Sequence, residues 1–127
     1  MGQTLLDAIQ ERVLLCDGAM GTQLQLAGLE PGGCGEAWNL DHPDRLVKIQ
    51  QAYVEAGSDC LLSNTFGGCR VMLERHDHGD DVAVINAAGV ELARRAFGER
   101  RGFVIGDIGP FGGLMEPHGD IPEQRVR

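Results

Sequence analysis

Three short stretches of this chain combine acids, amides and glycines in a way that could bind a small polar ligand. They read "CDGAMGT" from residue 16, "SNTFGG" from residue 63 and "GDIGPFGG" from residue 106. In the first, Asp17 could accept hydrogen bonds from an amino group, and the amides of Gly18 through Thr22 could hold a carboxylate at a helix start. Asp-Gly is also a common turn pair, so local grounds alone favour a turn that caps the next helix.

The second and third stretches are open to two readings as well. The side chains of Asn64 and Thr65 could point into a pocket or bond only to their own backbone. The glycines of "GDIGPFGG" resemble a phosphate loop only loosely, because the GK[ST] ending and the dinucleotide spacing are both absent. Glu116 and Asp120 could form a carboxylate pair, although such residues are more often solvated.

The remaining metal-binding residue types do not form a recognisable site. His76 and His78 flank Asp77 in a polar link without a spaced third ligand, which favours a solvated linker. The four cysteines are separated by 17, 25 and 8 residues, which fits neither a CxxC metal knuckle nor a secreted disulfide scaffold. These four residues are Cys16, Cys34, Cys60 and Cys69. A reducing cytoplasm is the expected location.

The elements that would position the three stretches follow an α/β pattern. Apolar runs predict buried strands at 13–16, 59–63 and 103–105. Each of the three stretches comes directly after one of these strands. The carboxyl ends of parallel strands share one edge, where α/β proteins place their active sites, so the three stretches should converge on one cavity.

Helical periodicity fills the spaces between these strands. Helices are expected at 4–12, with Thr4 as cap, from Pro43 to a left-handed end at Gly57, near 69–75, and at 82–97, where Gly98 ends the helix. Strand, helix, strand, helix, strand predicts an α/β domain with right-handed parallel crossovers.

Length and charge narrow the class of protein. The chain has 127 residues and 43% hydrophobic content, enough for one core but not for two domains. Its formal net charge of −8 repels nucleic acid and anionic membrane surfaces. The N-terminal residues lack a basic start followed by a long apolar core, so no secretion signal or membrane span is indicated.

Taken together and in order, four segments closely resemble the opening part of the homocysteine S-methyltransferase family. They are "LLCDGAMGTQLQ", "EAWNLDHPDRLVKIQQAYVEAGSDCLLSNTFGG", "VINAAGVELAR" and "GDIGPFGGLMEPHGD". The family fold is a (β/α)8 TIM barrel, which needs about 250 residues. The resemblance therefore implies an N-terminal part of the barrel, about three βα units, with residues 1–127 as a partial homocysteine-binding domain lacking the C-terminal half.

The resemblance also implies a reaction and a site. In the family a zinc ion held by three cysteines binds homocysteine as thiolate, which attacks a methyl group and forms methionine. No Cys-Cys pair occurs here, so no catalytic or metal residue is assigned and the zinc ligands are expected beyond this chain. Cobalamin or folate is a possible methyl source. The residues that match the family's homocysteine pocket are Asp17, Gly18, Ala19, Gly21, Thr22, Asn64 and Thr65.

Two other functions stay open at this point. The chain could be a non-catalytic half-barrel that binds the amino acid and assembles with a partner supplying the remaining strands. An unrelated doubly wound domain that binds a phosphate ligand is less favoured by the glycine spacing. Three strands leave two open sheet edges, so self-association or a missing C-terminal half is expected.

Overall fold

The protein is described by a computed structural model that covers residues 2–126. Along these residues the elements are α1 (Leu5–Glu11), α2 (Gly21–Leu26), α3 (Trp38–Asp41), α4 (Pro43–Glu55), β1 (Cys60–Leu62), α5 (Arg70–Leu73), the 3-10 helix η1 (Glu74–His76), α6 (Val82–Phe97), β2 (Phe103–Ile105) and the 3-10 helix η2 (Glu123–Arg125). The fold is thus a mixed α/β arrangement, as the sequence predicts.

The two strands pair in parallel, with Cys60 opposite Phe103 and Leu62 opposite Ile105. The chain between them passes through α5, η1 and α6, in line with the predicted strand–helix–strand pattern. The strand predicted at 103–105 is confirmed with the same bounds, and the strand predicted at 59–63 is one residue shorter at each end.

The prediction of a strand at 13–16, buried on both faces, is wrong. This segment lies beside β1 but makes only one isolated parallel bridge, between Cys16 and Cys60. Val13 is 84% exposed and Leu15 is 58% exposed. The segment is apolar, but no residue within 2–126 covers the side chains of Val13 and Leu15. The described residues therefore form two continuous strands rather than three complete βα units, and they do not close a barrel.

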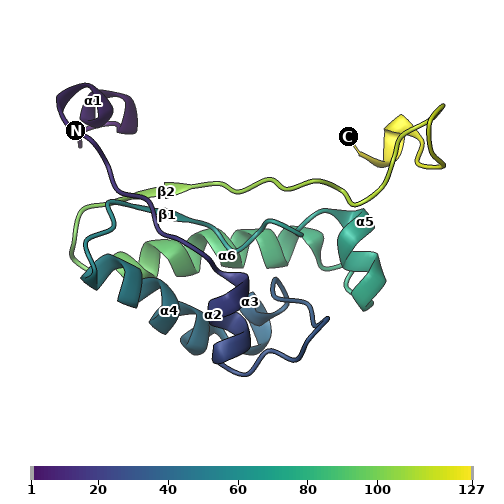
Figure 1. The fold of residues 1–127 in the computed structure, drawn as a ribbon, viewed down its shortest axis with the longest axis horizontal. Helices are drawn as coiled ribbons and strands as arrows, with labels where there is room; N and C mark the ends of the chain where they lie inside the picture. The colour runs from purple at the N-terminus through teal and green to yellow at the C-terminus, as the bar shows by residue number, and fades with distance from the viewer. Residues whose placement is uncertain (1, 127) are drawn as a thin grey trace.

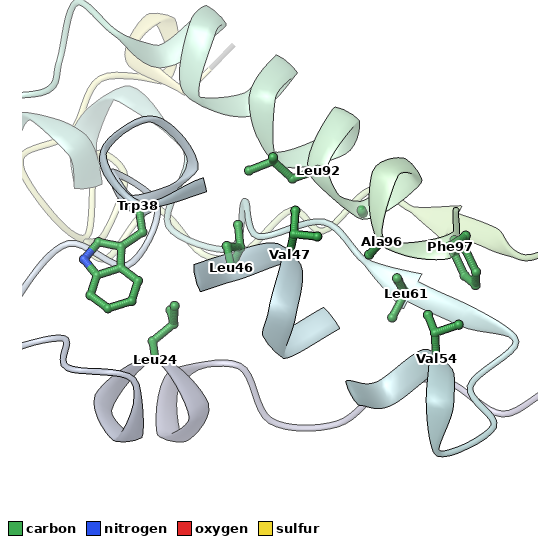
Figure 2. Packing of buried hydrophobic residues seen from close by; sticks show 10 residues of the cluster. Leu24, Trp38, Leu46, Val47, Val54, Leu61, Leu92, Ala96 and Phe97 are labelled. Carbon is green, nitrogen blue, oxygen red and sulfur yellow. The ribbon is translucent and has the colours of Figure 1, made fainter. Parts of the chain in front are cut away.

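The core lies on one side of the sheet. In Figure 1, α2, α3, α4 and α6 all lie on the same side of β1 and β2, and α1 stands apart from them. Figure 2 shows the side chains that fill the space between α4, α6 and β1, with Leu61 of the strand facing Val54 and Ala96. The buried cluster comprises Leu24, Trp38, Leu46, Val47, Val54, Leu61, Leu92, Ala93, Ala96 and Phe97.

The predicted helices are present, although the one near 69–75 is divided into α5 and η1, and the short helix α3 was not predicted. The predicted capping role of Thr4 is confirmed, because its hydroxyl accepts the Asp7 N–H at 3.2 Å and the Asp7 carboxylate accepts the Thr4 N–H at 3.2 Å. Helix α6 has the predicted bounds and ends at Gly98, whose φ is 58°. Gly57 follows α4 with φ of 110°, also as predicted. No helix within residues 2–126 is long and apolar enough to cross a membrane.

Candidate functional site

A cavity of about 420 Å³ opens at the carboxyl end of β1, within the size range of small-molecule sites. One wall comes from residues 17–25 and a second from the loop that precedes α3. The residues that follow β1 and β2 supply the rest of the lining. The location is the strand edge where the sequence places a pocket, and it arises because both strands run in the same direction.

Asp17 lines this cavity and is also anchored to the neighbouring strand. Both oxygens of its carboxylate accept the backbone N–H of Leu62, each at 3.2 Å. Burial raises the pKa of Asp17, the bond from Leu62 opposes this rise, and the nearby charge of Asp107 adds to it. The carboxylate therefore has a fixed position in the lining of the cavity and an unfavourable environment that a cationic ligand would relieve.

Asn64 is held across the fold from β1 to α3. Its Nδ2 donates to the carbonyl of Gly35 and to Oδ1 of Asn39, both at 2.9 Å. The backbone carbonyl of Asn64 accepts a hydrogen bond from Nδ2 of Asn39 at 2.9 Å. Because both amide protons are used within the protein, Oδ1 is the side-chain atom of Asn64 that remains for a ligand donor.

Thr65 joins the ends of the two strands instead of lining the cavity. Its hydroxyl donates to the carbonyl of Asp107 at 2.7 Å and lies 2.7 Å from the hydroxyl of Ser63. The Ser63 hydroxyl in turn accepts the Asp107 N–H at 3.0 Å. This small network fixes the loop after β1 against the loop after β2.

The cavity brings together four of the seven predicted site residues, namely Asp17, Gly18, Gly21 and Asn64. The other three, Ala19, Thr22 and Thr65, belong to the same two segments but do not line it. The carbonyl of Ala19 accepts the Tyr53 hydroxyl at 2.7 Å, which ties this segment to α4.

Eleven other residues line the cavity, and none of them was assigned as a site residue from the sequence. Glu36 reaches the cavity from the loop before α3, and its Oε1 accepts the Gly67 N–H at 2.7 Å. Asp107 and Phe66 lie in the loops after β2 and β1. The strand-end rule that selects Asp17 applies equally to Asp107, whereas nothing in the local sequence of Glu36 indicates its contact with Gly67.

The charge of the cavity lining favours a cationic group. Asp17, Glu36 and Asp107 place three carboxyl groups in its lining, which favours an ammonium group over an anion.

No group of three or more His, Cys, Asp or Glu side chains within residues 2–126 could hold a metal ion. The side chains of this segment therefore do not fit a zinc site, and no chemical step through zinc is derived from them.

Known proteins similar to this chain point to one family. The family model for homocysteine S-methyltransferase matches residues 14–127. The methionine synthases of Mycobacterium tuberculosis and Mycobacterium leprae are 40% and 39% identical to this chain; each alignment covers 84% of the chain and 10% of the relative. The chain thus spans about a tenth of the length of these relatives.

A structural comparison agrees at the level of the fold. The metallated form of the homocysteine methyltransferase MmuM from Escherichia coli matches with a TM-score of 0.71 at 24% identity, over 84% of this chain and 42% of that one. Its oxidized form matches with the same TM-score at 23% identity. The arrangement of helices on one side of β1 and β2 is therefore that of a fragment of this methyltransferase fold. With the match of the family model over residues 14–127, these findings show that the chain belongs to the homocysteine S-methyltransferase family.

Proposed function

We propose that this chain forms the amino-acid end of a homocysteine site in an enzyme that transfers a methyl group to the homocysteine thiol. The observation that carries the proposal is that Asp17 and Asn64 lie in one cavity of a chain that belongs to this family. Asp17, with Glu36 and Asp107, would bind the ammonium group. The backbone of 18–22 leads into the first turn of α2, where N–H groups without intrahelical partners would bind the carboxylate.

We propose that the methyl transfer itself depends on groups outside residues 2–126. Zinc is the metal that the family implies, with cobalamin or folate as methyl source. The role of the described residues is to bind and orient the substrate, which fixes where its thiol lies relative to the reacting groups. The cytoplasm remains the expected location, on the basis of the cysteine spacing alone.

Calorimetric titration of the purified chain with homocysteine tests the proposal. Asp17→Asn removes the charge but keeps an oxygen to accept the Leu62 N–H, so the local fold should persist. A charge-assisted hydrogen bond contributes about 1.5–3 kcal/mol, so this variant should bind homocysteine about 10–100-fold more weakly. Glu91→Gln, which removes an exposed charge on α6 away from the cavity, is the matched control and should bind as the wild type does.

Blocked ligands separate recognition of the amino acid from unspecific binding. N-acetyl-homocysteine lacks the ammonium charge and homocysteine methyl ester lacks the carboxylate, so both should bind at least about tenfold more weakly than homocysteine. Equal affinity of the three ligands, or an unchanged affinity of the Asp17→Asn variant, would refute the proposed orientation.

A non-catalytic assembly role is the second candidate, and one observation favours it. The outer side of segment 13–16 exposes Val13 and Leu15, and no described residue covers it. A second chain that continues the sheet would bury these side chains. The homocysteine titration distinguishes the two functions, because a pure assembly module has no reason to discriminate among the three ligands.

A further inference from the structure

Two of the four cysteines lie side by side on neighbouring parallel chains. The Cys60 N–H donates to the Leu15 carbonyl at 3.0 Å, and the Asp17 N–H donates to the Cys60 carbonyl at 3.0 Å. These two bonds place Cys16 opposite Cys60 in a parallel bridge. Residues paired in this way project to the same face of the sheet. The two thiols therefore share one face.

The spacing of such neighbours suits a disulfide. Adjacent strands lie about 4.8 Å apart, within the range of about 4.4–6.8 Å between Cα atoms that disulfides span. Cys16 is part of a single bridge instead of a continuous strand, so its backbone has fewer ladder bonds to resist a small shift. Cys34 and Cys69 lie in the loop before α3 and at the start of α5, and neither belongs to such a bridge.

The pair is also accessible from one side. A groove of about 590 Å³ runs between α1 and the open face of the sheet, and both Cys16 and Cys60 line it. Cys16 is exposed, whereas Cys60 is 1% exposed. A small reagent in the groove would therefore meet Cys16 first.

We propose that Cys16 and Cys60 form a thiol pair that reacts with low-molecular-weight disulfides and closes to an intramolecular disulfide. The Cys16 thiolate attacks one sulfur of the small disulfide, which breaks its S–S bond and releases one thiolate. Cys60 then loses its proton to solvent, and its thiolate attacks the Cys16 sulfur and releases the second thiolate. The two protein thiols lose two electrons in total, and the small disulfide is reduced to two thiols.

Electrostatics sets the order of these steps. Burial, followed by the adjacent Cys16 thiol, raises the pKa of Cys60 to about 11, and the charges of Asp59 and Asp17 add to the rise. Two further charged residues, Glu11 at the end of α1 and Arg12 directly after it, line the same groove as Cys16 and Cys60. Cys60 is therefore a thiol at neutral pH and reacts second. Because the second step needs its thiolate, closure should accelerate roughly tenfold per pH unit between pH 7 and 9.

The experiment treats the reduced 127-residue chain with oxidised glutathione and maps the products by mass spectrometry after acid quenching. The expected product is a Cys16–Cys60 crosslink, formed at least about tenfold faster than any other cysteine pair because the two thiols have a high effective concentration. In guanidine, where the bridge is lost, this preference should disappear.

Single substitutions test each step. Cys60→Ser should stop at a mixed disulfide on Cys16, and Cys16→Ser should form no crosslink to Cys60. Cys34→Ser and Cys69→Ser are the controls and should close as the wild type does. If Cys60→Ser fails to fold, as judged by circular dichroism, the peptide map of the wild-type chain still decides. A wild-type chain that accumulates the Cys16 adduct without closing, or that crosslinks its cysteines without preference, would overturn the proposal.

Discussion

Asn39 is the side chain whose removal should most clearly weaken the frame of the cavity. It is 3% exposed, and its Nδ2 donates to the carbonyls of Asn64 at 2.9 Å and Ile85 at 3.0 Å. Its Oδ1 accepts from Asn64. One amide thus joins α3 to α6 and to the loop after β1. Asn39→Ala removes three buried hydrogen bonds at about 0.5–1.5 kcal/mol each, so the free energy of unfolding should fall by about 2–4 kcal/mol.

Urea unfolding followed by circular dichroism measures this loss. The midpoint should fall by about 1–2 M with an unchanged slope, because the surface exposed on unfolding stays the same. Asn39→Asp should cost at least as much at pH 7, since it sets a carboxylate against two carbonyl oxygens. Gln51→Ala, at an exposed position of α4, is the control and should stay within about 0.5 kcal/mol of the wild type. An Asn39→Ala variant that also stays within about 0.5 kcal/mol would refute the reasoning.

The Arg12 guanidinium lowers the pKa of Asp59 to about 2. The stability that this pair contributes should therefore be fully present above about pH 4, the ordinary pKa of an aspartate, and should be lost as the pH falls through about 2. Unfolding of the wild type and of Arg12→Gln at several pH values should show a stability difference that follows this course. Gly89→Ala would bring a methyl group to 2.8 Å from side-chain atoms of α3 and of the loop after β1, so thermal melting should show a loss of about 1–3 kcal/mol. Light scattering should give a mass above that of the monomer, and charged substitutions at Val13 and Leu15 should shift it toward the monomer; a monomeric wild-type chain would contradict this expectation.

The elements with local signals could be predicted from the sequence, and the elements that depend on distant partners could not. Helix α6 has an apolar face with a helical period and a glycine at its end, so both bounds follow from nearby residues. The run at 13–16 is equally apolar, but apolar character does not say which face is covered. The single bridge of this segment joins Cys16 to Cys60, which lies 44 positions further along the chain.

The candidate site divides along the same line. The rule that polar residues after parallel strands line a pocket selects Asp17 and Asn64, and both line the cavity, although the segment before Asp17 forms only a single bridge. It also selects Thr65, whose hydroxyl instead bonds to the carbonyl of Asp107 at 2.7 Å, since the rule is blind to side-chain direction. The strand-end rule does not select Glu36, because the hydrogen bond that Glu36 accepts from the Gly67 amide spans 31 positions.

The one-sided packing of the helices has a consequence for local opening of the fold. β1 has chain neighbours along both edges and α4 and α6 on one face, whereas α1 buries Ala8 alone among its residues. Amide hydrogen exchange should therefore divide the chain into two cooperative units. Amides of β1 and of the turns of α4 and α6 that face it should exchange only through global unfolding. Amides of α1 should exchange through separate, low-energy fraying that leaves the rest of the molecule folded.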